Sequence, residues 1–176
     1  MTTLLGISGS LRAGSTNTKL MRYAAELFAP DTFVEADINL PLFNADTQEK
    51  EGIPASVQTL ADQIAAADAV IISTPEYNKA PPGSLKNALD WVSRTKGGPW
   101  KNKPVAIMSA AAGRAGGERT QFALRLMMTP FRPNILQGPE VMIADSGNAF
   151  DENGRLTNER SVAVLTELMD ELKARI

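Results

Sequence analysis

The segment from residue 8 to residue 17 combines hydroxyl side chains, glycine and one cation in a way that could bind an anion. It reads Ser-Gly-Ser-Leu-Arg-Ala-Gly-Ser-Thr-Asn, and Arg12 is its only charged residue. A short apolar run at 4–7 precedes it and a helical pattern follows it. Its hydroxyls and backbone N–H groups would therefore lie at a helix N-terminus, which attracts anions because its first N–H groups lack partners and the helix dipole is positive there. The segment predicts a phosphate site.

Other interpretations of this segment explain less of it. An ordinary N-capping turn would account for Ser15 or Thr16 but would leave the concentration of hydroxyls unexplained. Gly6, Gly9 and Gly14 do not have the G-x-G-x-x-G spacing of a dinucleotide-binding loop, and a P-loop would need Gly-Lys-Ser/Thr. A monophosphate held by hydroxyls and amides fits the segment better than a pyrophosphate.

Two further loops each follow a predicted strand and could complete a binding site. Residues 74–83 contain three prolines, which stiffen the chain, and they carry Tyr77 and Asn78. The ring and the amide of these two side chains could face a flat heteroaromatic ligand. Residues 109–117 are nearly all alanine and glycine, which lets a backbone approach a ligand closely. Taken alone, each loop is equally consistent with a structural role.

The composition excludes several kinds of chemistry. The 176 residues include no cysteine and no histidine, which excludes thiol catalysis, disulfides, zinc bound by His or Cys, and a Ser-His-Asp triad. Difficult reactions would therefore depend on a bound cofactor. A net charge of −2 gives no basic field for nucleic acid. With no basic leader and no apolar run of bilayer length, we expect a cytoplasmic protein without metal, nucleic-acid or membrane partners.

The elements that would position these loops alternate along the chain. Strands are predicted at 4–7, 33–38, 69–72, 105–108 and 141–144, and helices at 18–28, 57–67, 85–92, 117–128 and 157–174. Ser84 is the expected N-cap of the third helix, and residues 39–46 are expected to form a surface loop. This alternation favours one α/β domain over residues 1–176 with a doubly wound sheet, in which ligands bind beyond the carboxyl ends of the strands.

Three segments resemble the NADPH-dependent FMN reductase family, which includes quinone, azo-dye and chromate reductases. The matching segments are Gly9-Ser10-Leu11-Arg12-x-Gly14-Ser15-x-Asn17, Pro75-Glu76-Tyr77-Asn78 with Gly83-x-Leu85-Lys86-Asn87-Ala88-x-Asp90-Trp91, and Gly113-x-x-Gly116-Gly117. The middle segment is the most specific, and beyond about residue 128 the resemblance is one of length and element order. The resemblance implies a flavodoxin-like α/β fold: a three-layer sandwich whose five-stranded parallel sheet has the order 2-1-3-4-5, with helices on both faces.

The resemblance also implies where noncovalent FMN would lie. By position, the FMN phosphate would be bound by Ser10, Arg12, Ser15, Thr16 and Asn17. The isoalloxazine ring would be lined by Pro75, Glu76, Tyr77 and Asn78, with Ser109 and Gly113 approaching it from the third loop. The family further implies a homodimer, or a tetramer, with the helix at 85–91 contributing to the subunit interface.

The expected function is that of an NAD(P)H-dependent oxidoreductase. NADPH or NADH would deliver hydride to the flavin, and a quinone, azo compound, chromate, free flavin or ferric acceptor would then take the electrons. Glu76 could act through its backbone alone or could transfer a proton, and the sequence leaves both open. The alternatives are a flavodoxin-like FMN electron carrier and a flavin- or phosphate-binding module without turnover. The small net charge disfavours the carrier, because carriers tend to dock through a charged face.

Overall fold

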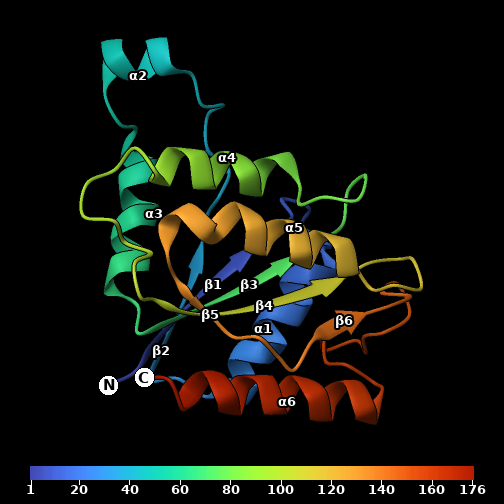
Figure 1. Cartoon of the computed structure of the whole chain (residues 1–176). Helices are drawn as coiled ribbons and strands as arrows, with labels where there is room; N and C mark the ends of the chain where they lie inside the picture. The colour runs from blue at the N-terminus through green and yellow to red at the C-terminus, as the bar shows by residue number, and fades with distance from the viewer.

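A parallel β-sheet forms the middle layer of the computed structural model, which describes residues 1–176 (Figure 1). Its strands are β1 (Thr3–Ser8), β2 (Thr32–Ala36), β3 (Ala69–Thr74), β4 (Pro104–Ala110), β5 (Asn134–Ile135) and β6 (Val141–Ile143). The strand order is β2-β1-β3-β4-β5, β6 also pairs with β4, and every pairing is parallel. The predicted flavodoxin-like order 2-1-3-4-5 is confirmed.

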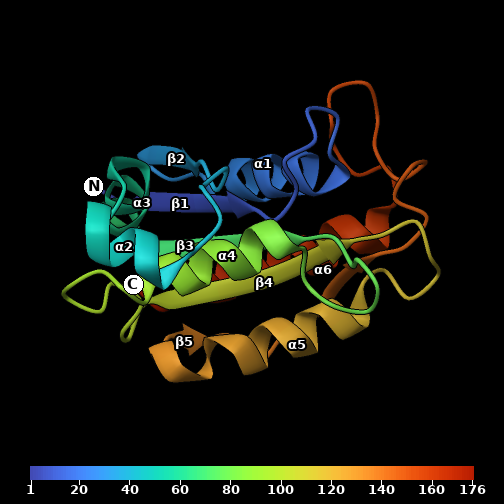
Figure 2. The ribbon, with the colours of Figure 1, turned by 90° about the horizontal axis from the view of Figure 1, so that it is seen from above.

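Helices cover both faces of the sheet (Figures 1 and 2). They are α1 (Thr16–Phe28), α2 (Ala45–Glu51), α3 (Ala55–Ala66), α4 (Gly83–Val92), α5 (Glu118–Met128) and α6 (Glu159–Lys173), with a 3₁₀ turn at Thr129–Phe131. Helices α1 and α6 lie on one face, and α3, α4 and α5 lie on the other. The predicted helices are all present, with small shifts at their ends. No helix combines the length and the apolar character needed to cross a bilayer.

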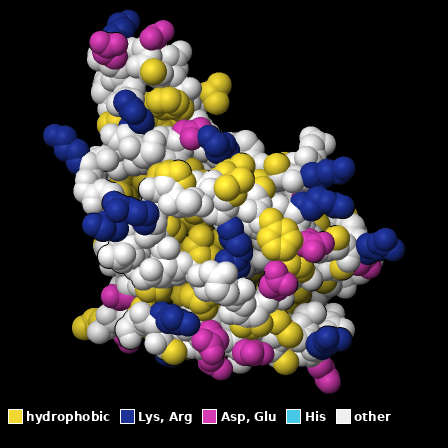
Figure 3. All heavy atoms as spheres, viewed as in Figure 1, with side chains coloured by type: hydrophobic (Ala, Val, Ile, Leu, Met, Phe, Trp, Pro, Cys, Tyr) yellow, Lys and Arg dark blue, Asp and Glu magenta, His cyan; other side chains and the backbone are white.

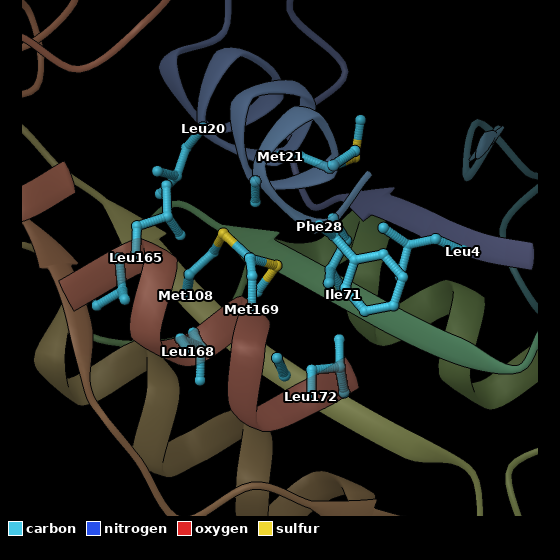
Figure 4. Close-up of a cluster of buried hydrophobic side chains, with 14 of the residues drawn as sticks. Leu4, Leu20, Met21, Phe28, Ile71, Met108, Leu165, Leu168, Met169 and Leu172 are labelled. Atoms are coloured by element: carbon cyan, nitrogen blue, oxygen red, sulfur yellow. The ribbon is translucent and has the colours of Figure 1, made fainter. Parts of the chain in front are cut away.

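The central strands are buried on both sides, which explains why their sequences are apolar runs instead of alternating patterns. Along β1, Leu4 packs beneath α1 and α6, whereas Leu5 packs beneath the helices of the opposite face. In β3, Ile71 likewise packs on the face of α1 and α6, and Ile72 packs on the opposite face. Figure 4 shows the first of these clusters, in which Leu168 and other residues of α6 meet side chains of α1 and the sheet. Both layers of helices are therefore fixed by the strands between them.

The fifth position of the sheet is shared by two short strands instead of the single strand predicted at 141–144. Strand β5 pairs with the start of β4, and β6 pairs with its end. The segment between them, 136–140, contains Pro139, which has no N–H group to donate to a ladder. Side chains of α5 bind carbonyls on either side of the interruption: Arg125 Nη1 donates to Leu136 O and Gln121 Nε2 donates to Val141 O, both at 2.8 Å.

Two local predictions were wrong. Pro82, not Ser84, is the N-cap of α4, and Ser84 Oγ instead donates to Gly9 O at 3.0 Å. Residues 39–46 do not form a loop throughout, because α2 begins at Ala45 with Asn44 as its N-cap. Helix α2 stands away from the body of the molecule (Figure 1) and buries none of its residues. A helix without a buried face leaves no apolar periodicity in its sequence.

Candidate functional site

The loops that follow β1, β3 and β4 meet at the carboxyl ends of these strands (Figure 2). A cavity of about 230 Å³ lies there. Its lining residues are Ser10, Arg12, Ser15, Thr16, Asn17, Pro75, Glu76, Tyr77, Ala110, Ala111, Ala112 and Ser146. Doubly wound sheets bind their ligands at this position, because the strand order reverses there and leaves a crevice between neighbouring loops.

The first loop brings hydroxyl groups to the N-terminus of α1. Ser15 is the N-cap of this helix, and its Oγ accepts hydrogen bonds from Asn17 N–H at 3.2 Å and Thr18 N–H at 3.3 Å. Thr16 Oγ1 donates to Ser146 Oγ at 3.3 Å, and both residues line the cavity. Arg12 is exposed and supplies a guanidinium to the same cavity. Hydroxyls, a helix N-terminus and one cation together are the chemistry that binds a phosphate.

The charges at the cavity also fit an anionic ligand. Glu76 is the only carboxylate among its lining residues. Its Oε2 accepts hydrogen bonds from the backbone N–H groups of Arg119 and Thr120, and Arg119 Nη1 lies 3.8 Å from its Oε1. This carboxylate is therefore already matched by donors of the protein. No group of three or more Asp or Glu side chains is placed to hold a metal ion.

Asn17 lines the cavity, but its side-chain amide is engaged in the interior. Nδ2 donates to Ala110 O at 2.9 Å, and Oδ1 accepts from Ala110 N–H and from Ser73 Oγ, both at 3.0 Å. The residue is 2% exposed. Its amide joins the start of α1 to the ends of β3 and β4. The predicted contact of Asn17 with phosphate stays a prediction.

The first loop lies against the end of β3 and the start of the second loop. Gly9 N–H donates to Ser73 O at 2.8 Å. A Cβ atom at Gly9 would lie 3.0 Å from Thr74 Oγ1 and 3.2 Å from Pro75 Cδ, so the two loops can approach this closely because residue 9 is a glycine. Beyond Pro75, Tyr77 is 49% exposed and lines the cavity. Its ring offers an apolar face to a planar ligand.

Three predicted site residues do not line the cavity: Asn78, Ser109 and Gly113. Asn78 lies in the turn that follows Tyr77 and has a left-handed backbone with φ of 51°. Ser109 is fully buried, and its Oγ donates to Gly116 O at 2.6 Å and accepts from Gln121 Nε2 at 2.9 Å. Gly113 is exposed in the third loop. Their predicted contacts with a flavin ring stay predictions.

Ser146 is a cavity residue that sequence reasoning missed. It follows β6 in the loop that leads to α6, and it is 7% exposed. The loop after the strand predicted at 141–144 has one serine and one glycine at 145–150, instead of the hydroxyl-rich or glycine-rich runs that mark the first and third loops. The sequence signal was the small polar pair Ser146-Gly147, which comes soon after that strand and thus at the same edge of a parallel sheet.

A larger cavity, about 540 Å³, lies between α4 and the end of α5. Leu89, Trp100 and Phe131 line it, and Trp100 and Lys101 precede the start of β4. This cavity therefore lies toward the amino end of β4, away from the loops that follow the strands. Although this cavity is larger, none of the three loops lines it, so it is not the candidate site.

Comparisons with known proteins agree with this fold. Residues 2–148 match the family model described as NADPH-dependent FMN reductase. An NAD(P)H-dependent FMN reductase of Pseudomonas aeruginosa is 42% identical over 172 residues, which cover 97% of this chain and 92% of that protein. A quinone reductase of Escherichia coli K12 is 39% identical over 162 residues, 90% of this chain and 86% of the relative. The structure of FerB, a flavoenzyme NAD(P)H:acceptor oxidoreductase of Paracoccus denitrificans, matches with a TM-score of 0.88 at 33% identity, covering 99% of this chain and 96% of that one.

Proposed function

The chain belongs to the NADPH-dependent FMN reductase family, and we propose that it passes electrons from NAD(P)H through bound FMN to quinones. It is an NAD(P)H-dependent oxidoreductase with FMN as its cofactor. The observation that supports this proposal most directly is the cavity where the N-terminus of α1 meets the stiff aromatic loop after β3. Quinones are proposed as acceptors because relatives that match most of the chain are named quinone reductases.

The cavity residues fit the two ends of FMN. The hydroxyls of Ser10, Ser15 and Thr16 and the guanidinium of Arg12 would bind the phosphate. The Pro75–Tyr77 wall would lie along the ring system, where Tyr77 has an exposed aromatic face. When bound, FMN supplies the hydride-accepting centre that no side chain here provides. The chain's own part is to bind and orient that cofactor.

The acceptor range and the organisation of the protein belong to the proposal as well. Azo compounds, chromate, free flavin and ferric iron stay predictions beside quinones, as do the single domain over 1–176 and the cytoplasmic location. We also propose a homodimer. Helix α5 exposes Phe122 and Leu126, four residues apart on one helical face, with exposed fractions of 53% and 75%. Figure 3 shows apolar side chains gathered over α5 and its border with α4, as expected of a contact surface.

Stopped-flow spectroscopy tests the proposed reaction. FMN-loaded protein should be reduced by NADPH or NADH within the turnover time, and an added benzoquinone should reoxidise it in a separate half-reaction. Initial rates at varied concentrations of both substrates should then give parallel lines. Slow reduction by both nicotinamides, with fast one-electron exchange, would favour the carrier. Colourless protein without FMN affinity would favour a phosphate-binding module.

The phosphate end of the site is tested with Arg12→Gln. Because Arg12 is the only cation lining the cavity, we expect this variant to weaken FMN binding about tenfold, the usual scale for one charge-assisted contact. Riboflavin, which lacks the phosphate, should bind equally to the wild type and the variant. The matched control is Arg175→Gln, which changes an exposed arginine near the C-terminus. Equal losses for FMN and riboflavin would contradict the assignment.

A further inference from the structure

Helix α5 begins without a capping side chain of its own. Gly117 is its N-cap, with φ of 91° and ψ of 30°. Glu118 N–H donates to Ala115 O at 3.2 Å in the preceding turn. The next two N–H groups, those of Arg119 and Thr120, belong to the first turn and have no carbonyl partner within the helix. They need acceptors from elsewhere in the molecule.

The glycine at the N-cap excludes the usual solution. Helices are capped best by Ser, Thr, Asp or Asn at this position. A Cβ atom at Gly117 would lie 2.9 Å from both Cβ and Oγ of the buried Ser109, and the left-handed backbone disfavours any side chain there. The close approach of α5 to the end of β4 thus removes the local cap.

Glu76 replaces the missing cap from the loop after β3. Its Oε2 accepts from Arg119 N–H at 3.1 Å and from Thr120 N–H at 3.3 Å. Thr120 Oγ1 donates to Pro75 O at 3.1 Å, so a third hydrogen bond joins the same loop to the same turn. The Glu76 side chain is only 16% exposed. A negative group is also favourable at this place because the N-terminus of a helix carries positive partial charge.

We propose that Glu76 is a positioning residue of the flavin site, whose carboxylate caps α5 and thereby holds the Pro75–Tyr77 wall against the loop that begins α5. The inference rests on the proposed function, because it takes the cavity to be the FMN site. It assigns Glu76 a role other than proton transfer, since both carboxylate oxygens face donors of the protein. Loss of the cap would loosen the wall on which the ring lies.

The test compares Glu76→Ala, which removes the acceptor, with Glu76→Gln, which keeps a carbonyl oxygen on a side chain of the same length. Hydrogen exchange of the Arg119 and Thr120 amides is measured in the apoprotein. FMN affinity and the pH profile of kcat are measured in the loaded enzyme. The matched control is Glu118→Ala, which removes an exposed carboxylate from the same helix end that accepts no hydrogen bond from those amides.

We expect Glu76→Ala to speed exchange of the two amides and to weaken FMN binding, each by about tenfold, the usual consequence of losing a helix cap. Glu76→Gln should stay within about threefold of the wild type in both measurements, with an unchanged pH profile, because a neutral acceptor retains most of a capping interaction. Glu118→Ala should change neither the exchange of the two amides nor the affinity for FMN. Should Glu76→Ala fail to fold, Glu76→Asp, whose carboxylate is one methylene short, replaces it.

Two results would overturn the inference. If Glu76→Gln lost turnover as fully as Glu76→Ala and also lost a limb of the pH profile, Glu76 would be a proton-transfer group. If Glu76→Ala kept both amide protection and FMN affinity, the cap would have no positioning role. A wild-type protein that bound no FMN would instead contradict the proposed function, and amide exchange in the apoprotein would still decide whether Glu76 caps α5.

Discussion

A single buried amide, that of Asn17, organises the end of the sheet next to the phosphate loop. It satisfies both the N–H and the C=O of Ala110, as a neighbouring strand would, and it accepts from Ser73 Oγ as well. The residue belongs to the first turn of α1, directly after Ser15 and Thr16. Asn17 can therefore influence phosphate binding without contacting the phosphate, because it fixes where the helix begins.

Asn17→Asp tests this interpretation because it removes the Nδ2 group that donates to Ala110 O. The new oxygen would face Ala110 O with no proton between them, so we expect the free energy of unfolding to fall by about 2 kcal/mol, the cost of leaving buried polar groups unpaired. Urea denaturation of the apoprotein measures it. The exposed control Asn39→Asp should stay within about 0.5 kcal/mol of the wild type. An Asn17→Asp variant of normal stability with weak FMN binding would instead make Asn17 a direct ligand.

At the scale of elements, the connection from β4 to α5 depends on glycines in very different surroundings. Gly116 has φ of 60°, and a Cβ there would lie 2.6 Å from the carbonyl carbon of Met142 in β6. That neighbour is backbone inside the sheet and cannot move aside. Gly113, four residues after Ser109 in the same connection, has no atom within 4 Å of an added Cβ. Substitution by alanine should therefore destabilise the fold at Gly116 and leave it nearly unchanged at Gly113.

Gly116→Ala should lower the free energy of unfolding by about 3 kcal/mol, from left-handed strain combined with overpacking. Gly113→Ala should change it by no more than about 0.5 kcal/mol. Thermal unfolding of the apoproteins compares them. An FMN titration of Gly113→Ala then tests whether the ring approaches this loop, as the family resemblance implies, because an added methyl group would obstruct it. A Gly116→Ala variant as stable as the wild type would contradict the packing account.

Elements buried on both faces could be predicted from the sequence, whereas contacts between distant loops could not. The runs at 4–7 and 69–72 are apolar because helices cover both sides of β1 and β3, so local composition was sufficient. Helix α2 was missed because it has no buried face, and the split of the fifth strand was missed because β5 and β6 are so short. The position of the three loops together, at the carboxyl ends of the strands, was predictable from the sequence.

Within the site, residue types were predicted better than their partners. Ser84 is expected as a helix cap from its residue type, and Ser109 as a ring contact from the family resemblance, but Ser84 donates to Gly9 O and Ser109 donates to Gly116 O. Glu76 was left with two open roles, because its partners on α5 are more than forty positions away. Such partnerships depend on the packing of β4 against α5, which no local pattern encodes.

At the scale of the whole molecule, the proposed homodimer is tested with Phe122→Glu. The substitution places a carboxylate in the exposed apolar face of α5, and burying it in a subunit contact without a partner would raise the dissociation constant at least about a hundredfold. Sedimentation velocity should then show a species of 18.9 kDa. The control Ile176→Glu changes an exposed apolar residue at the C-terminus and should leave the dimer intact. A Phe122→Glu protein that remained dimeric would place the interface elsewhere.

The edges of the sheet have a consequence for the behaviour of the protein at high concentration. One edge is β2, where Glu35 is bound by Arg22 of α1 at 2.7 Å, a hydrogen bond that raises the pKa of the guanidinium. The other edge is divided between β5 and β6, of two and three residues. Fibril growth from native protein requires a long row of unpaired N–H and C=O groups on which another chain can align. The interrupted edge offers no such row, so the folded protein is protected against growth by strand addition there.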